Sequence, residues 1–449
     1  MRQPSTLSAT VRFPGCQLKV VYLLLGLALI GLSPGFSLAE VVQEGRGVCA
    51  LPLLPHSGDA RVDRDIVHYQ ARARSALNGA GDPVPWLERL GWALVAKARE
   101  SFDSGFYTLA SSCADCLEQT RPGTAEALLL RSHVLVSLHR FAEAESMARK
   151  LVERRGAWFD EALLGDALME QGKLEAAVKH YQAMVDQRPG PQAYTRISHL
   201  RWLKGDLPGA IDLLRRAVRA TDSREAEASA WTLVRLAQLE HQTGTSEASE
   251  RSLGAALELV PNYAPALLAR GRWRLARGNA EAALPYLRSA EAANPLPEYR
   301  WALIEGLHAA GQAPEAAAVE ARLSRSGQSD DPRTFSLYLA TCAQDAALAV
   351  RLAKSELKAR GDVFTLDAVA WACRAAGRLN EAREHAQGAL AEGTIDARIF
   401  LHAGVIASES GNRDEAHRLL DLAHGLLHTL LPSERLALER GLEQLARKS

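Results

Sequence analysis

Two cysteines with the spacing of a redox motif stand early in the chain, as Cys113-Ala-Asp-Cys116. A CxxC pair performs thiol–disulfide exchange when it follows a strand, and it attaches a c-type haem when a histidine comes next. Here Leu117 occupies the histidine position, and the surrounding pattern is helical. We therefore interpret the pair as structural and expect a disulfide from Cys49 to Cys113 or Cys116, or a local bridge.

The remaining cysteines allow one more pairing. Cys342 and Cys373 fall on neighbouring predicted helices and can be joined if their Cα atoms lie close enough. The sixth cysteine, Cys16, lies in the leader segment described below. The five that remain are an odd number, so at least one thiol stays free or pairs outside the chain.

Three histidines near the end of the chain have the spacing of a helical stripe. His417, His424 and His428 are seven and four residues apart, and the last two have the i, i+4 spacing of zinc ligands. A hydrated outer face explains them equally well, and no HExxH motif accompanies them. We expect no metal and no cofactor, and these histidines are the alternative metal site.

The chain begins with the composition of a secretory signal peptide. Arg2, Arg12 and Lys19 form a basic region without acidic residues, an apolar run follows at 20–32, and small residues precede a cleavage point after residue 39. No basic flank follows the apolar run, so cleavage is favoured over a membrane anchor. We expect a periplasmic or secreted protein without stable membrane insertion. The alternative is an inner-membrane anchor made by the uncleaved segment.

Charge and composition exclude some classes of function. The 53 basic and 53 acidic residues balance, and no basic patch stands out. The electrostatic footprint of a protein that binds nucleic acid or anionic lipid is therefore missing. Only 6% of the residues are aromatic, while alanine and leucine dominate, which favours close-packed helices over sheets.

A repeat of 34 residues organises most of the chain. Gly244 and Pro261 recur 34 positions later as Gly278 and Pro295, and each unit has two amphipathic stretches around a turn residue. A small residue five positions after each turn lets the second helix approach the first closely. The turn residues are Gly105, His139, Gly172, Gly205, Gly244, Gly278, Gly311, Gly377 and Gly411.

This pattern predicts an all-α fold, an α-solenoid of about ten helix hairpins over residues 86–428. Residues 40–85 are expected to form an extension with a capping helix, and residues 429–449 a second capping helix, because the end hairpins of a solenoid expose a face that must be covered. A degenerate hairpin without the turn glycine is expected near 331–360, and an insertion at 221–227.

The repeats resemble the tetratricopeptide repeat family. Its pattern is matched most clearly by Leu164-Gly165, Leu168, Gly172, Ala177, Tyr181 and Pro189, although Glu161 stands where the family has tryptophan. Residues 63–77 and 364–412 are also similar to a group of exported bacterial repeat proteins whose activity is not settled. The resemblance implies the fold strongly and the function weakly.

In this family the first helix of each hairpin lines a concave groove, so the resemblance implies which side chains face a partner. Aromatic and arginine side chains suit such a groove, since they contribute large buried area and paired bonds to carboxylates. Each tryptophan can equally be part of the packing between hairpins. The expected groove residues are Arg99, His133, Asp166, His199, Trp202, Trp231, Gln238, His241, Arg272, Trp301, Glu305, His308, Phe364, Asp367, Trp371 and Arg374.

The sequence thus favours a non-catalytic scaffold that binds protein or peptide partners in its groove, with a role in an envelope complex. The chaperone-binding members of the family use asparagine and lysine on first helices to hold a terminal carboxylate, and that asparagine is absent here. The alternatives are a glycan-binding protein or an accessory subunit of a polysaccharide-processing enzyme, with Asp166, Glu305 or Asp367 as candidate acids. The partner and the oligomeric state cannot be read from the sequence.

Overall fold

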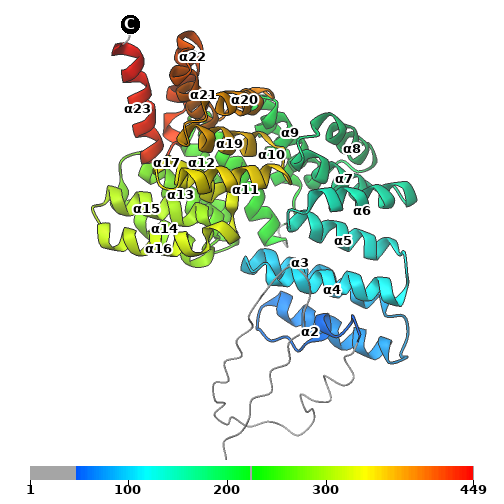
Figure 1. Cartoon of the computed structure of the whole chain (residues 1–449). Helices are drawn as coiled ribbons and strands as arrows, with labels where there is room; N and C mark the ends of the chain where they lie inside the picture. The colour runs from blue at the N-terminus through cyan, green and yellow to red at the C-terminus, as the bar shows by residue number, and fades with distance from the viewer. Residues whose placement is uncertain (1–46, 223–224, 448–449) are drawn as a thin grey trace, which may run out of the picture. The chain divides into compact units, whose positions relative to one another are not determined.

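The computed structural model describes residues 47–222 and 225–447, and these residues form one compact unit that is entirely helical (Figure 1). The predicted signal peptide lies outside the described residues. Within them, no helix is both long enough and apolar enough to cross a membrane.

Twenty of the helices described pair into ten consecutive hairpins. The first helices are α3 (Val84–Ser101), α5 (Ala125–Ser137), α7 (Trp158–Glu170), α9 (Pro191–Leu203), α11 (Ala226–Gln242), α13 (Ala264–Ala276), α15 (Pro297–Ala309), α17 (Pro332–Thr341), α19 (Val363–Ala375) and α21 (Ala397–Glu409). Their partners are α4 (Gly105–Thr120), α6 (Phe141–Arg154), α8 (Leu174–Gln187), α10 (Leu207–Ala220), α12 (Ser246–Leu259), α14 (Ala280–Ala293), α16 (Ala313–Asp330), α18 (Ala346–Leu357), α20 (Leu379–Leu390) and α22 (Arg413–Gly425).

Helices outside the hairpins occupy both ends of the array. The short η1 (Leu51–Leu53) and α2 (Arg61–Leu77) precede the first hairpin, while η2 (Leu427–Thr429) and α23 (Pro432–Arg447) follow the last one. Ile66 on α2 and Leu438 on α23 are buried against the neighbouring hairpins. The all-helical, superhelical architecture expected from the repeat is therefore confirmed.

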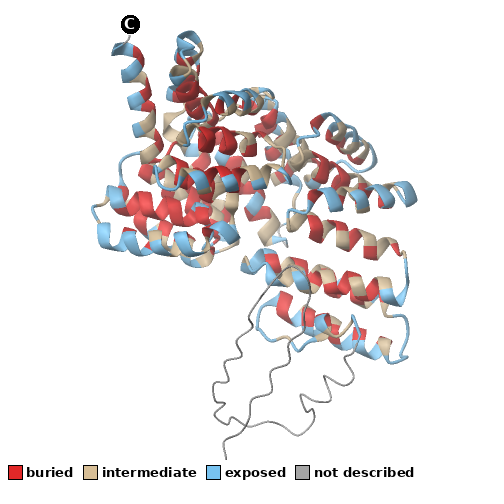
Figure 2. Cartoon of the chain, viewed as in Figure 1, coloured by how far each residue is buried: buried red, intermediate tan, exposed pale blue. Residues whose placement is uncertain are grey.

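Small residues hold the two helices of each hairpin close together. The residue five positions after each predicted turn residue is fully buried in every case, which leaves no room for a larger side chain. Figure 2 shows the buried residues gathered where helices face one another. These residues are Ala110, Ala144, Ala177, Ala210, Ser249, Ala283, Ala316, Ala382 and Ala416.

The turns follow the predicted ladder with one shift. A left-handed backbone recurs at His139 and at the glycines from Gly172 to Gly411, and Ala343 takes this conformation in the degenerate hairpin of α17 and α18. In the first hairpin the left-handed residue is Phe102 rather than Gly105. The reason is that α3 ends at Ser101, so Gly105 already begins α4, where its N–H donates to the Asp103 carboxylate.

The superhelix is coiled so tightly that successive turns touch. Arg360 pairs with Glu170, the Gly361 N–H donates to the Glu170 carbonyl at 3.1 Å, and the Thr394 hydroxyl donates to the Leu203 carbonyl at 2.7 Å. The side-chain contacts join residues 190 and 191 positions apart. In Figure 1, α19 and α20 accordingly lie beside α9 and α10.

An apolar core also spans this contact between turns. Leu203 and Leu207 of the fourth hairpin share one buried cluster with Val363, Ala389 and Ile399 of the ninth and tenth. Two glycine pairs bring the backbones together: a Cβ on Gly172 would lie 2.4 Å from the Gly361 carbonyl oxygen, and one on Gly205 would lie 2.7 Å from that of Gly393. The ninth and tenth hairpins therefore pack against the fourth.

A pair of matched substitutions tests the contact between turns. Gly172 and Gly278 both have φ of +74°, but only Gly172 faces another segment. Gly172→Ala and Gly278→Ala should share the cost of a left-handed alanine, about 1 kcal/mol. Gly172→Ala should lose about 1–3 kcal/mol more, because the Gly361 carbonyl cannot move aside. Thermal and urea unfolding measure the difference, and equal losses would contradict the contact.

Candidate functional site

The closing of one superhelical turn on the next leaves a cavity of about 370 Å³ inside the array. Its walls come from α9, α11, α13, α15, α17, α19 and α21, and the segment around η2 covers one side. Seven of the expected groove residues lie on the walls: Trp202, Gln238, His241, Arg272, Trp301, Phe364 and Asp367. The concave face therefore carries a partly open pocket with polar and aromatic walls.

Aromatic rings from distant repeats meet on the walls of the cavity. Trp202 stacks on Phe364 with ring centroids 5.4 Å apart, and the Trp202 indole N–H donates to Gln242 at 3.0 Å. His241 stacks on Trp273 at 4.3 Å. Trp202 also contacts His199, and His241 also contacts His428, so these two rings are held in place.

A reciprocal contact between two histidines holds the segment around η2 against α11 at one side of the cavity. His241 and His428 each place Nε2 near the backbone carbonyl of the other, at 3.2 Å and 2.8 Å. Burial lowers the pKa of His241 to about 4, so its ring is neutral at neutral pH. The Ser433 N–H donates to the Glu305 carboxylate at 3.0 Å, which joins the same segment to α15.

Ion pairs hold most of the charged groups on the walls. Arg272 lies 2.9 Å from Glu298, and Arg398 pairs with the buried carboxylate of Glu434. Burial alone would raise the pKa of Glu434, but Arg398, Arg272 and a backbone N–H together lower it below its ordinary value. Burial raises the pKa of Asp396, whose carboxylate accepts backbone N–H groups at the start of α21.

Part of the repeat array matches a known protein family. Residues 162–225, which form α7 to α10 and the linker after them, match the description "Tetratricopeptide repeat". The chain therefore contains tetratricopeptide repeats. Members of this family generally mediate protein–protein interaction and are typically non-catalytic scaffolds. None of the curated proteins matches the chain.

Several solved structures share the helical-repeat arrangement at low similarity. A chain of the APC/C hetero-tetramer Cut9–Hcn1 is 13% identical with a TM-score of 0.43; the match covers 88% of this chain and 62% of that chain, less than two thirds of its length. Yeast Tom70 is 12% identical with a TM-score of 0.37, covering 86% and 97%. MamA is 15% identical with a TM-score of 0.28, covering 35% and 91%. At these values the likeness says nothing about partners.

The other expected groove residues of the tetratricopeptide array do not line the cavity, and neighbouring side chains hold them in place. Trp231 is the exception, since 41% of it is exposed. The contacts pair Arg99 with Glu227, His133 with Trp92, Asp166 with Arg196, His199 with Arg235, Glu305 with Trp301, His308 with Glu320, Trp371 with His402 and Arg374 with Glu409.

Two of the expected binding tryptophans belong to the core. Trp301 is only 2% exposed and packs on Tyr338, and Trp371 is 3% exposed and stacks on His402 at 4.0 Å. Replacing either by alanine would remove core packing at a cost of about 3–5 kcal/mol. These residues therefore cannot report on partner binding alone.

The three candidate acids do not form a catalytic set. Asp166 is held by Arg196 and Tyr181, and Glu305 accepts from Trp301 and Ser433. Asp367 alone lines the cavity, and both of its carboxylate oxygens contact the buried His402 ring at 2.9–3.0 Å. Burial raises the pKa of Glu305 above its ordinary value.

The cavity also contains residues that the family positions do not include. Arg235 could have been found from the sequence, because it lies four residues after Trp231 and three before Gln238, on the same stripe of α11. Arg398 and His428 gave no such signal, since they reach the cavity only through the curvature of the superhelix. The additional wall residues include Arg235, Trp273, Glu298, Arg333, Arg398, His428 and Glu434.

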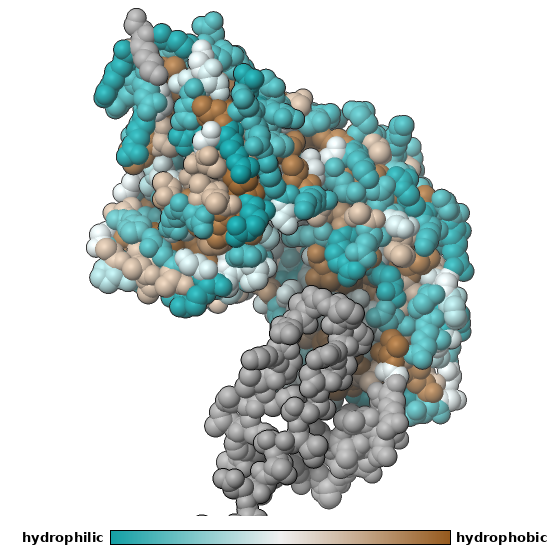
Figure 3. All heavy atoms as spheres, viewed as in Figure 1, coloured by the Kyte–Doolittle hydropathy of each residue, from teal (hydrophilic) through white to brown (hydrophobic). Residues whose placement is uncertain are grey.

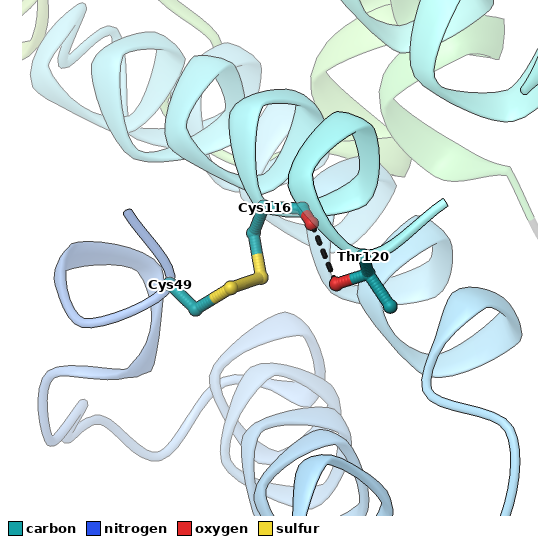
Figure 4. Close-up of a disulfide and its surroundings, with 3 residues drawn as sticks. All are labelled: Cys49, Cys116 and Thr120. Atoms are coloured by element: carbon teal, nitrogen blue, oxygen red, sulfur yellow. Dashed lines mark hydrogen bonds between the residues drawn. A yellow bond between two sulfur atoms is a disulfide. The ribbon is translucent and has the colours of Figure 1, made fainter. Parts of the chain in front are cut away.

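One disulfide joins the start of the described chain to the first hairpin. Cys49 is bonded to Cys116 on α4, with Cα atoms 4.8 Å apart, and the Thr120 hydroxyl donates to the Cys116 carbonyl at 2.7 Å (Figure 4). Cys113 is a buried free thiol whose pKa is raised by burial. The two cysteines of the CxxC pair therefore have separate roles.

Cys342 and Cys373 are not joined. Cys342 is exposed at the end of α17, whereas Cys373 is buried on α19. Burial raises the pKa of both thiols, but the charged groups that also act on the pKa differ. They are Glu305 and Glu320 for Cys342, and Lys354 and Glu381 for Cys373. The two thiols thus lie in separate environments.

The histidine stripe predicted near the end of the chain is broken. Helix α22 ends at Gly425, so His428 lies in η2 and turns toward His241 instead of continuing the row of His417 and His424. Among the residues described, no group of three or more histidine, cysteine, aspartate or glutamate side chains is arranged to hold a metal ion.

The Arg398–Glu434 pair is open to a stability test. Arg398→Gln leaves the Glu434 carboxylate, which is 1% exposed, without its guanidinium, and should cost about 3–5 kcal/mol at pH 7. The pKa of Glu434 should then rise, so the deficit should narrow as the pH falls below about 5. Urea unfolding across this pH range measures both effects.

Two controls accompany this variant. Adding Glu434→Gln to Arg398→Gln should restore most of the lost stability, because no buried charge remains. Arg140→Gln, which breaks an exposed pair with Glu143, should change stability by less than about 1 kcal/mol. A loss at Arg398 that stays constant with pH would contradict the assignment.

Proposed function

We propose that this tetratricopeptide-repeat protein is an exported, non-catalytic scaffold that takes a short segment of a partner protein into its interior cavity. The observation that carries the proposal is the cavity itself, a chamber of about 370 Å³ with stacked aromatic walls and hydrogen-bonding side chains from seven first helices. Ligand pockets have volumes of roughly 300–1,000 Å³. The size suits a short extended segment rather than a whole helix.

The walls favour peptide recognition for two physical reasons. Large rigid aromatic rings contribute buried area at little cost in side-chain entropy, and amides such as Gln238 can pair with a peptide backbone. Because the first helices are fixed by their neighbours, little ordering entropy is lost when a segment binds. The outer surface contrasts with these walls, since mainly hydrophilic side chains cover the visible C-terminal helices (Figure 3).

Filling the cavity should weaken peptide binding strongly. Gln238 is exposed to the cavity on α11, so Gln238→Trp should occupy the space of the ligand and weaken peptide capture about ten-fold or more. Gln182→Trp places the same bulk on the exposed side of α8 and should leave capture unchanged. Capture of a random peptide pool by immobilised protein, with affinities from fluorescence anisotropy, makes the comparison. Equal capture by both variants, or binding of glycans but no peptide, would contradict the proposal.

Export is supported by the cysteines as well as by the leader. The Cys49–Cys116 disulfide closes a loop of 67 residues, and such bonds persist in oxidising compartments but are rare in the cytosol. The disulfide belongs with the proposed periplasmic or secreted location, where it would secure the first hairpin of a scaffold in an envelope complex.

Location and disulfide can be tested together. We expect protein from the native host in the envelope or extracellular fraction, starting near residue 40 and yielding a Cys49–Cys116 linked peptide in non-reducing mass spectrometry. Cys49→Ser should lower stability by about 4 kcal/mol on the chain-entropy account of a loop this long, whereas Cys342→Ser should change little because that thiol is free and exposed. Reduced protein in the cytosolic fraction would contradict export.

A further inference from the structure

Arg235 is a charged side chain on the cavity wall whose counter-charge is missing. It projects from α11, and among the described residues no carboxylate lies within ion-pair distance of its guanidinium. Its contacts are the Gln238 amide oxygen at 2.9 Å, His199 Nδ1 at 3.3 Å and the face of Trp202, 5.6 Å away. Each of these partners is neutral.

The neutrality of His199 follows from its surroundings. Burial, reinforced by the positive charge of Arg235, lowers the pKa of His199 to about 3. Its Nδ1 can therefore accept a hydrogen bond from the guanidinium without adding charge. Gln238 and His199 thus fix the direction of the Arg235 guanidinium, but they do not neutralise its positive charge.

The other arginines on the cavity walls differ in this respect. Arg272 pairs with Glu298, Arg398 with Glu434, and Arg333 with Asp362 at 3.2 Å. Burial lowers the pKa of Arg235, and the Glu298 carboxylate, which pairs with Arg272, offsets this only in part. The nearby Glu434 carboxylate raises the pKa of Arg398. Among these four arginines, only Arg235 has no carboxylate within ion-pair distance in the described part of the chain.

We infer that Arg235 is the anchor for a carboxylate on the bound peptide segment. A guanidinium presents five N–H donors in a planar fork, and the two contacts named above leave donors for a bidentate bond to a carboxylate. A half-buried cation without an ion-pair partner carries a desolvation cost, and a bound carboxylate offsets that cost in the bound state only. The inference rests on the proposed function, since it names the group that the cavity recognises.

The carboxylate has two sources in a peptide, an acidic side chain or the chain terminus. Four pools of short random peptides separate them: free or amidated C-termini, each with or without aspartate and glutamate. The amidated pool without acidic residues carries no carboxylate. Capture of each pool is measured on wild-type protein, on Arg235→Gln, and on Arg288→Gln as a control, because Arg288 pairs with Glu315 on the exposed face of α14.

We expect the wild type and Arg288→Gln to capture the pool without carboxylates about ten-fold or more weakly than the best pool. Arg235→Gln should capture all four pools equally and weakly, with a melting temperature equal to or above that of the wild type. The pool that retains wild-type capture identifies the source of the carboxylate. Should Arg235→Gln fail to fold, Arg235→Lys keeps the charge without the fork and should bind more weakly.

Two results would overturn the inference, and they are distinct from a failure of the proposed function. If the wild type captures peptides without preference for a carboxylate, or if folded Arg235 variants capture the same peptides as the wild type, Arg235 is not the anchor although the cavity still binds peptides. If the wild type captures no peptide from any pool, the proposed function and the inference fall together.

Discussion

The contact between successive turns of the superhelix governs the rest of the structure. Where Gly172 meets the Gly361 carbonyl, two backbones approach with no side chain between them. Such close approach is available to glycine and is costly to any larger residue. Because it repeats at Gly205 and Gly393, the curvature of the array is fixed by several contacts rather than by the packing of neighbouring hairpins alone.

That curvature decides what kind of surface the concave face becomes. In an open solenoid the first helices form a long groove that is accessible along its length. Here Trp202 stacks on Phe364, and His241 contacts His428 across the superhelix. Much of the concave face is therefore covered by contacts within the chain. What remains is a chamber whose walls come from seven helices. Because the charged groups of the chamber are buried, the stability of each charge depends on its partner, as in the Arg398–Glu434 pair.

The sequence predicts local features of this fold well and its long-range features poorly. The buried small residues, such as Ala283 and Ala316, follow from the repeat because each lies at the same distance in sequence from the turn of its own hairpin. In the first turn, Phe102 rather than Gly105 has the left-handed backbone, because α3 ends at Ser101. The repeat does not specify the length of this helix. Trp301 and Trp371 have the type and spacing of binding residues, but their burial depends on helices from later repeats.

The nearly constant offset in sequence between touching turns bears on how such a chain can change in evolution. Arrays whose repeats contact only their neighbours can gain or lose a unit, and their stability is close to a sum over units. In this chain Lys204 must meet Glu392 and His241 must meet His428, at 188 and 187 residues. Removing one repeat between them would shift every such pair by a whole hairpin. The number of repeats between the two turns is therefore part of the structure's definition, and the molecule should behave as a closed architecture of fixed size.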